Sequence, residues 1–294
     1  MTDPTLEHVP AYPSPLREFW QSFSASKGAV IALGVFALML VLAVFAGWIA
    51  PYEPIEQFRD RMLVPPVWQA GGSMQHVLGT DEAGRDLLSR LIFGARISLF
   101  IAFMSVLMSL VPGVVLGLLA AFFPKAVGAS ITRVMDILLA LPALLLAICI
   151  ITILGPGLVN TMIAIAVGTM PSYTRLARAA ALAEINKEYV TASRVAGAGV
   201  ARLMFLTVLP NCMAPLIVNA TLGFSSAILE TAALGFLGLG VQQPTPEWGT
   251  MLSAARDYIQ RAPWVVTLPG LAILVSVLAI NLMGDGLRAA LDPR

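Results

Sequence analysis

Long apolar stretches recur along the chain, and the segments between them hold most of its charged residues. A helix needs about 20 mainly apolar residues to cross the hydrocarbon core of a bilayer. The pattern therefore predicts an all-α integral membrane protein with about six transmembrane helices. They are expected at Ala29–Ala50, Ile97–Phe123, Val134–Leu154, Leu158–Pro171, Ala214–Gly240 and Trp264–Met283.

Some features inside these stretches refine the prediction. The first stretch is longer than the ~7–15 apolar residues of a signal peptide, so we expect it to remain as an anchor. Pro112, Pro142 and Pro269 are expected to be tolerated, because neighbouring helices can re-satisfy the backbone groups that proline frees. Gly113 and Gly117 have the spacing of small residues in close contacts between membrane helices.

Composition agrees with a chain that lies mostly in lipid. Of 294 residues, 58% are hydrophobic and 12% are charged, and the mean hydropathy is +0.83. Soluble domains carry roughly 25% charged residues. The net charge of +1 gives no electrostatic reason to expect a nucleic acid partner. Cys149 and Cys212 lie far apart in the sequence and indicate neither a disulfide nor a metal site.

The orientation follows from the Lys and Arg residues in the connections, which are more frequent in cytoplasmic segments. With six helices and the N-terminus inside, the inner connections hold more of them than the outer ones. Both termini are therefore expected in the cytoplasm. The predicted organisation is a cytoplasmic segment 1–28, a first helix 29–50, an outer loop 51–96, a five-helix core 97–288 and a cytoplasmic tail 289–294.

The outer loop is expected to have an extended part and a helical part. Residues 51–72 are rich in proline and aromatic residues and predict an extended surface segment. From Gly79 onward the pattern becomes helical, with Glu82–Arg85 and Asp86–Arg90 expected to pair at helical spacing. Five apolar residues then share one face: Leu87, Leu88, Leu91, Ile92 and Ala95. This predicts an amphipathic helix at the membrane surface that leads into the second span.

The sequence lacks the motifs of common enzymes. It has no GxSxG, HExxH or GxxxxGK segment, so neither a hydrolase, a zinc enzyme nor a P-loop ATPase is indicated. Its two histidines, His8 and His76, lie on opposite sides of the first predicted span and cannot share a metal. We therefore expect a non-catalytic chain that binds no cofactor or metal itself.

The longest predicted cytoplasmic connection, about residues 184–210, has a regular pattern. Ile185, Tyr189, Ala192 and Ala196 form one stripe of a helix. Gly197-Ala198-Gly199 is expected to end this helix, because glycine readily adopts the left-handed conformation. A second helical run, Val200–Leu209, is expected to stop at Pro210. Such an element fits a groove on a partner, and an ordinary surface loop fits the periodicity equally well.

The same loop resembles that of binding-protein-dependent ABC importer permeases. Their pattern is Glu-Ala-Ala, three residues, Gly, nine residues, Ile-x-Leu-Pro. Here the triplet is Thr191-Ala192-Ser193, the glycine is Gly197 and the end is Thr207-Val208-Leu209-Pro210. The chain departs from the pattern with Thr for Glu, Ser for the second Ala and Thr for Ile.

Other segments are similar to the C-type permeases of the dipeptide, oligopeptide and nickel family. These are Leu78–Leu99, Tyr189–Gly199, Leu234–Gly240, Pro246–Leu252, Asn281–Arg288 and Leu291–Pro293. Trp48–Tyr52, Glu56–Asp60 and Gly71–Met74 resemble the subunits of dipeptide systems in particular. The similarity covers nearly the whole chain from Phe19 onward.

The resemblance implies a type I ABC importer permease with the MetI-like fold, in a bacterial inner membrane. It implies a second, B-type permease subunit, two ATPase subunits that use ATP and Mg, a periplasmic peptide-binding protein and a dipeptide substrate. The ATPase-coupling loop would contain Tyr189, Thr191, Ala192, Ser193, Gly197, Ala198, Gly199, Leu209 and Pro210. On this interpretation Gly197→Pro is expected to uncouple transport. A nickel or oligopeptide permease is the alternative, and a stand-alone secondary transporter or channel is the alternative from another class.

Glu230 is the one acidic residue well inside a predicted span. A carboxylate there is costly, at about 2.5–3.5 kcal/mol on insertion scales if it lies at the bilayer centre. It is expected either to face the transport pathway, near the amino terminus of a peptide, or to pair with a polar group between permease subunits. We favour the second interpretation.

Overall fold

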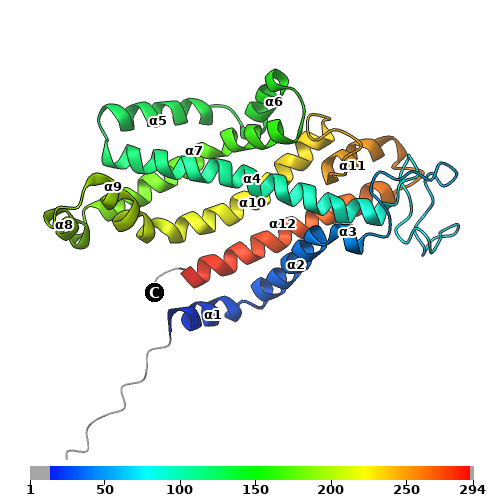
Figure 1. Ribbon diagram of the computed structural model, residues 1–294, viewed down its shortest axis with the longest axis horizontal. Coiled ribbons are helices and arrows are strands. Elements are labelled where there is room, and N and C mark those ends of the chain that lie inside the picture. Colours follow the sequence, from blue (N-terminus) through cyan, green and yellow to red (C-terminus); the bar gives the residue numbers. More distant parts are fainter. Residues whose placement is uncertain (1–13, 292–294) are drawn as a thin grey trace, which may run out of the picture.

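The computed structural model describes residues 14–291, and over this range it is built of helices with no β-strand. Residues 1–13 and 292–294, which belong to the predicted cytoplasmic segments 1–28 and 289–294, lie outside the described residues. The helices are α1 (Pro15–Ala25), α2 (Lys27–Val44), α3 (Ala46–Ile49), α4 (Leu87–Phe122), α5 (Ala126–Leu139), α6 (Ala143–Leu154), α7 (Leu158–Ile185), α8 (Glu188–Val195), α9 (Val200–Arg202), α10 (Met213–Phe236), α11 (Trp248–Ala255) and α12 (Trp264–Leu291). A π-helical turn η1 (Leu203–Val208) and a 3-10 turn η2 (Leu209–Cys212) join α9 to α10, and the 3-10 turn η3 (Arg256–Tyr258) follows α11. The long helices run roughly along one direction, with α8 at one end and α11 near the other (Figure 1).

Within the described range, four helical segments are long and apolar enough to cross a membrane. They are Lys27–Val44, Leu87–Phe122, Val200–Phe236 and Trp264–Leu291. The pair α5 and α6 makes a fifth span if it is counted as one. The 28 residues of α7 are long enough for a sixth, but α7 does not meet the same test of apolar character.

The prediction that Pro142 lies inside one continuous helix at Val134–Leu154 is wrong. The structure has two helices there, α5 and α6, which meet at an angle of 91°. Pro142 lies at the break and precedes the first residue of α6. Proline has no N–H to continue a helix and keeps the residue before it out of the helical region. Pro112, Pro171 and Pro269 by contrast lie inside continuous helices.

Close packing of α4 against α7 forms the centre of the bundle, where the two helices lie side by side (Figure 1). A Cβ atom on Gly113 would lie 2.8 Å from the Cβ of Tyr173. One on Gly117 would lie 2.6 Å from both the Cβ of Ala177 and the carbonyl oxygen of Thr174. The close helix contact predicted from the spacing of these two glycines is therefore confirmed.

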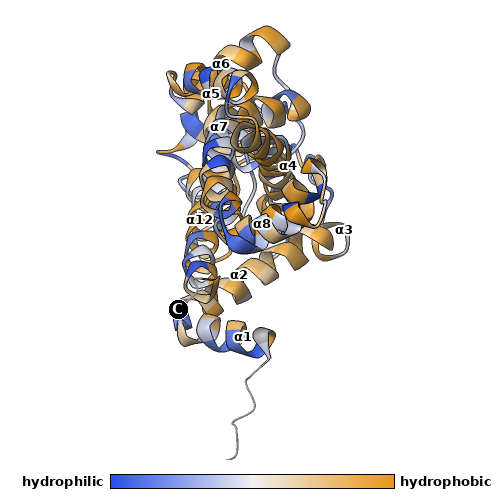
Figure 2. Ribbon diagram, turned by 90° about the vertical axis from the view of Figure 1, so that its left-hand side faces the viewer, coloured by the Kyte–Doolittle hydropathy of each residue, from blue (hydrophilic) through white to orange (hydrophobic). Residues whose placement is uncertain are grey.

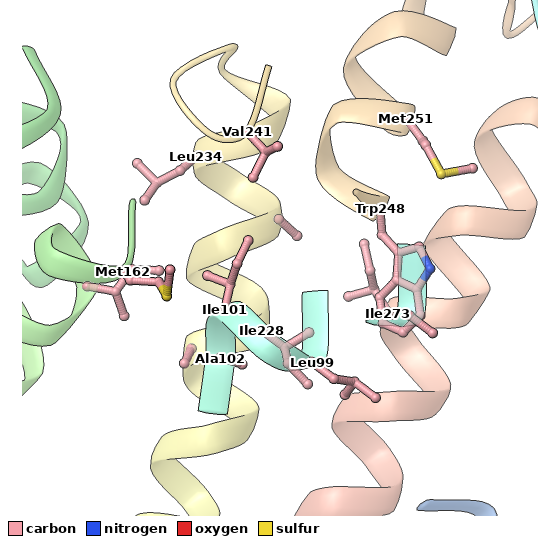
Figure 3. Packing of buried hydrophobic residues seen from close by; sticks show 14 of the residues in the cluster. Leu99, Ile101, Ala102, Met162, Ile228, Leu234, Val241, Trp248, Met251 and Ile273 are labelled. Carbon is pink, nitrogen blue, oxygen red and sulfur yellow. The ribbon is translucent and has the colours of Figure 1, made fainter. Parts of the chain in front are cut away.

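A buried apolar cluster connects α4 with α7, α10, α11 and α12. Figure 3 shows Ile228 of α10 and Ile273 of α12 near Leu99 of α4, with Trp248 of α11 beside them. The indole N–H of Trp248 donates to the carbonyl oxygen of Leu91 at 3.2 Å. Together these contacts fix α11 onto the helix bundle. Apolar residues cover the flanks of the long helices, as expected of surfaces that meet lipid (Figure 2).

The predicted amphipathic helix at the membrane surface is also different in the structure. Residues 51–86 form turns, and the first helix after them, α4, begins at Leu87 and continues through the second span for 36 residues. Asp86 ends the irregular segment by capping α4, since its carboxylate accepts from the backbone N–H of Ser89 at 2.8 Å. Gly84, with φ of +74°, breaks any helix that starts earlier.

The charged residues of this loop pair differently from the prediction. Asp86 does not bind Arg90; it contacts buried His76, with 3.0 Å between Oδ1 and Nδ1. Arg90 instead contacts Asp81, with 3.2 Å between Nε and Oδ2. The predicted Glu82–Arg85 pair is present at 2.8 Å, and Arg85 also contacts Asp81 at 2.6 Å. Helical spacing predicts the wrong partner for Arg90 because the segment before Leu87 is not helical.

Candidate functional site: the loop between α7 and α10

A short helix, α8, projects at the end of the bundle where α7 stops (Figure 1). One of its side chains is fully buried: Val190 packs in a cluster with Ala177 and Ala181 of α7 and Leu203 and Met204 of η1. The remaining α8 side chains are exposed or partly exposed. The helix is therefore held in place through one edge and leaves most of its surface uncovered.

The stripe predicted from the sequence lies mostly on this uncovered surface. Tyr189 is 38% exposed, Ala192 and Ala196 are exposed, and Ile185 is half-buried. Val195 beside them is 84% exposed. Thr191 is exposed and Ser193 is partly buried, so the triplet of the family pattern is accessible as well. An apolar stripe that the chain itself does not cover distinguishes a docking element from a loop that only shields its own helix ends.

Gly197 ends α8 in the way the sequence predicts. Its φ is +85°, a region that L-residues with a side chain rarely adopt. Its N–H donates to the carbonyl oxygen of Arg194 at 3.0 Å, and the N–H of Ala198 donates to that of Ser193 at 3.1 Å. These two bonds form a Schellman motif, which satisfies the last carbonyls of a helix. Gly199, which follows, has an ordinary φ of −68° and precedes α9.

A carboxylate that the sequence analysis did not single out holds the start of the loop. Glu184, near the end of α7, accepts from Nζ of Lys187 at 2.7 Å and from the hydroxyl of Tyr189 at 2.6 Å. These hydrogen bonds lower the pKa of Glu184. Loss of solvation and the bond to Glu184 raise the pKa of Tyr189 to about 12. In the sequence, the spacing Glu-x-x-Lys-x-Tyr could have indicated this contact, because it places three polar side chains around the turn that joins α7 to α8.

The second helical run does not stop at Pro210, contrary to the prediction. Its path continues from α9 through η1 and η2 into α10. The N–H of Leu209 donates to the carbonyl oxygen of Met204, five residues earlier, so the helix is widened just before the proline. Pro210 then lies at the start of the 3-10 turn, where its missing N–H leaves no bond unmade. Leu209 is partly buried and Pro210 is exposed.

Glu230 is not part of this loop; it lies in the second half of α10 and is partly buried. Its Oε2 is buried without a hydrogen-bond partner among the residues the structure describes. Both interpretations of Glu230 therefore remain open on geometry. No group of three or more His, Cys, Asp or Glu residues that could hold a metal is found within residues 14–291.

Two family models match the chain. Residues 113–294 match the family described as "Binding-protein-dependent transport system inner membrane component", and residues 14–66 match "N-terminal TM domain of oligopeptide transport permease C". The first match spans more than half of the chain and includes the whole loop. The chain belongs to this permease family.

Curated relatives match the permease from end to end. It is 66% identical to the "Di/tripeptide transport system permease protein DppC" of Pseudomonas aeruginosa, over 100% of this chain and 95% of the relative. It is 58% identical to the "Dipeptide transport system permease protein DppC" of Escherichia coli K12, over 100% and 98%. A "Peptide transport system permease protein SapC" of Escherichia coli O6:H1 is 42% identical over 95% and 94%.

A solved structure shows the same fold. The permease resembles a chain from the inward-facing MetNI methionine ABC transporter with a TM-score of 0.57 and 22% identity. The match covers 69% of this permease and 97% of that chain. The MetI-like fold predicted for the helical core is therefore confirmed, and this permease is a multi-pass membrane protein of the importer class.

Proposed function

We propose that this permease is a membrane subunit of an ATP-driven importer that carries dipeptides across the bacterial inner membrane. The names of the full-length relatives support the dipeptide substrate. The observation that carries the proposal is the uncovered apolar stripe on α8, formed by Tyr189, Ala192, Val195 and Ala196. A permease without a nucleotide-binding motif needs a surface to which an ATPase subunit can bind and transmit its conformational change. The exposed face of α8 is such a surface.

The partners follow from this role. A B-type permease completes the pathway, two ATPase subunits bind ATP and Mg, and a periplasmic binding protein delivers the peptide. This chain binds no cofactor and catalyses no reaction. Both termini and α8 lie on the cytoplasmic side, where the ATPase subunits are. Glu230 pairs with a polar group of the B-type permease, which supplies the partner that its Oε2 lacks among residues 14–291.

Coupling is a shift of populations. The closed ATPase pair binds one position of α8 better than another, and this difference in binding biases the pathway toward the outward-facing state. Hydrolysis removes the bias. For α8 to transmit such a shift, it must move with the bundle. The buried Val190 and the Glu184 contacts with Lys187 and Tyr189 fasten it to the end of α7 and to η1.

A pair of matched substitutions tests the docking surface. Val195→Glu places a charge on the α8 stripe, and Met74→Glu places one on an equally exposed apolar residue of the outer loop. Both residues are uncovered in this chain, at 84% and 79% exposure, so neither change disturbs its own packing. We expect Val195→Glu to abolish co-purification of the ATPase subunits and Met74→Glu to leave it intact. Equal recovery of the ATPase subunits with both variants contradicts the proposed role of α8.

Substrate class needs a separate measurement. Cells that lack the chromosomal copy and express this permease with its partner subunits are supplied with labelled dipeptide, tetrapeptide or nickel. We expect uptake of the dipeptide that disappears with Val195→Glu. Uptake of nickel or tetrapeptide alone identifies one of the alternative permeases. Dipeptide uptake without any ATPase subunit indicates a secondary transporter.

A further inference from the structure

The N-terminal segment contains a helix, α1, whose apolar residues gather on one face. Leu16, Phe19, Trp20 and Phe23 follow the spacing i, i+3, i+4, i+7 that places side chains on one side of a helix. Arg17, Glu18, Gln21 and Ser24 occupy the other side. Residues 1–28 were predicted only to form a cytoplasmic segment, although this spacing is readable in the sequence. α1 is therefore an amphipathic helix that needs a cover for its apolar face.

One end of that face is covered by the permease itself. Phe23 is 3% exposed and packs where α1 meets α12. Gly286 of α12 makes room for it, since a Cβ there would lie 2.9 Å from the Phe23 ring and 2.4 Å from the Cβ of Ala29. The rings of Phe19 and Trp20 stack on that of Phe23, with centroids 6.3 and 5.9 Å away. Because Phe23 is anchored on α12, the orientation of the rest of the apolar face of α1 is fixed as well.

The other end of the same face is uncovered. Leu16 is 81% exposed and Trp20 is 52% exposed, and both lie one or two turns before the buried Phe23. The apolar face thus begins against α12 and continues beyond the edge of the bundle, next to the end of α2 (Figure 1). The uncovered part of this face therefore needs an apolar environment just beyond the edge of the helix bundle.

The position of α1 is set by the first membrane span. Only Ser26 separates the two helices, and its hydroxyl caps α2 by accepting from the N–H of Ala29 at 3.4 Å. The exposed apolar residues of α2 begin at Val30 and Ile31, so the lipid-facing surface starts within one turn of this junction. A helix tied by one residue to the end of a span lies at the boundary between water and hydrocarbon.

Charge favours the same location. Arg17 and Lys27 are exposed at the two ends of α1, and Arg288 is exposed in the last turn of α12, the helix on which α1 packs. Basic residues beside an amphipathic helix interact favourably with anionic phospholipid headgroups. Tryptophan itself favours the headgroup level of a membrane, where one edge of its ring is apolar and its N–H stays hydrated.

We infer that α1 is an interfacial helix whose edge formed by Leu16 and Trp20 inserts into the bilayer leaflet at the end of α2. The occupant of this face is the lipid surface itself. The assignment to the cytoplasmic leaflet rests on the orientation proposed above. The contact between α1 and lipid does not depend on that orientation. The inference therefore stands or falls separately from the proposed substrate and from the docking of α8.

Spin labels on opposite faces of α1 test the inference in the assembled importer. The complex is reconstituted in nanodiscs of phosphatidylethanolamine and phosphatidylglycerol, with exposed Cys149 replaced by Ser. Labels are placed at positions 16 and 20, and matched labels at exposed Gln21 and Ser24 on the polar face. Collisions with oxygen, which concentrates in lipid, are compared with collisions with a water-soluble nickel chelate.

The expected result is a ratio of oxygen to nickel accessibility several-fold higher at positions 16 and 20 than at 21 and 24. Equal ratios on both faces place α1 in water and overturn the inference. Exclusion of both reagents from positions 16 and 20 shows that a partner subunit covers the face, and this outcome also overturns it. An unlabelled readout confirms the result: Trp20→Phe should lower the fraction of tryptophan fluorescence that brominated phospholipid quenches. An unchanged fraction contradicts a lipid contact.

Discussion

The two polar loops at opposite ends of the helix bundle are organised in opposite ways. In the outer loop, residues 51–86, the charged side chains of Asp81, Arg85 and Asp86 are buried together with Arg90 of the first turn of α4. In the inner loop, residues 186–199, Val190 is the one fully buried side chain. The outer loop is longer and richer in charge, yet it is the one that packs.

Complete pairing of polar groups explains how the outer loop packs. Asp81 contacts Arg85 and Arg90, and its second oxygen accepts backbone N–H groups of Ala83 and Arg85, each at 2.9 Å. Arg90 also donates to the carbonyl oxygen of Pro54 at 2.9 Å. Buried charges are tolerated when every oxygen and N–H has such a partner. A loop with few apolar residues thereby forms an interior of its own.

The inner loop shows the reverse. Its backbone is ordered by local devices, the Schellman motif at Gly197 and the Glu184 contacts, while its side chains stay uncovered. The outer loop thus completes its structure within this chain, whereas on the proposed function the inner loop completes its structure on an ATPase subunit. The following predictions test that difference.

The largest effect, on thermal stability, is expected from disrupting the buried ion pairs that Asp81 forms with Arg85 and Arg90. Asp81→Ala leaves Arg85 and Arg90 buried without their shared carboxylate. Removing one partner of a buried ion pair costs about 3–5 kcal/mol. We expect the midpoint of thermal unfolding, followed by near-UV circular dichroism in detergent, to fall strongly. Asp60→Ala, in an exposed position of the same loop, is the control and should leave the midpoint unchanged.

A middle-sized effect is expected at the end of α8. Gly197→Ala forces a side chain into a left-handed backbone conformation, at about 1–2 kcal/mol, although no atom lies within 4 Å of the new Cβ. Gly199→Ala adds an equally uncrowded methyl group at an ordinary φ. We expect Gly197→Ala to weaken ATPase binding about 5- to 30-fold, the factor that corresponds to this strain. Binding is measured by titrating ATPase subunits onto permease nanodiscs.

The comparison fails if both glycine variants bind alike. This alanine test is narrower than Gly197→Pro, which in addition removes the N–H bond to Arg194. Proline also fixes φ at about −65°, so a loss with proline but not with alanine shows that alanine still adopts the left-handed conformation, which proline cannot.

The smallest effect is expected from the titration of Glu184. Hydrogen bonds from Lys187 and Tyr189 lower its pKa in the folded loop from the ordinary value of about 4.5. Its contribution to stability is therefore present above about pH 4.5 and is lost as the pH falls further. The raised pKa of Tyr189 keeps the donor protonated up to alkaline pH. Exposed contacts of this kind contribute less than about 1 kcal/mol. We expect amide hydrogen exchange in α8, relative to the intrinsic rate, to increase at acidic pH.

Glu184→Gln is the variant that isolates this contribution. Its exchange in α8, after the same correction, should change less between neutral and acidic pH than that of the unaltered permease. The same acid response in both proteins would assign the opening to another group.

Features encoded by one short segment were predictable from the sequence. The apolar spans follow from runs of apolar residues, the α4–α7 contact from Gly113 and Gly117, and the end of α8 from Gly197. Each depends on residues that are neighbours in the sequence or on one helix face. The exposure of the α8 stripe was not predictable, because periodicity does not say which side of a helix the rest of the chain covers.

The wrong predictions share a different cause. The Asp86–Arg90 pair assumed that helical geometry starts before Leu87, whereas Gly84 and the capping role of Asp86 delay it. The predicted stop at Pro210 and the predicted continuous helix through Pro142 each applied a general rule about proline. The structure accommodates Pro210 by a wider turn and turns the chain at Pro142 by 91°. Which of these occurs depends on packing with distant segments.

The π-helical turn η1 has a consequence for single-residue deletions near the loop between α7 and α10. A π-helical turn such as Leu203–Val208 holds one residue more than an α-helix of the same height. Each residue advances a helix by about 100° around its axis. Deleting one residue from this turn would therefore restore an ordinary helix and leave α8 and α10 in nearly the same relative orientation. Deleting one residue from the regular part of α10 would instead rotate the loop by about that angle relative to the rest of the bundle, while every residue of the loop stayed the same. The direction in which the loop points is thus encoded by a residue count as well as by residue identities.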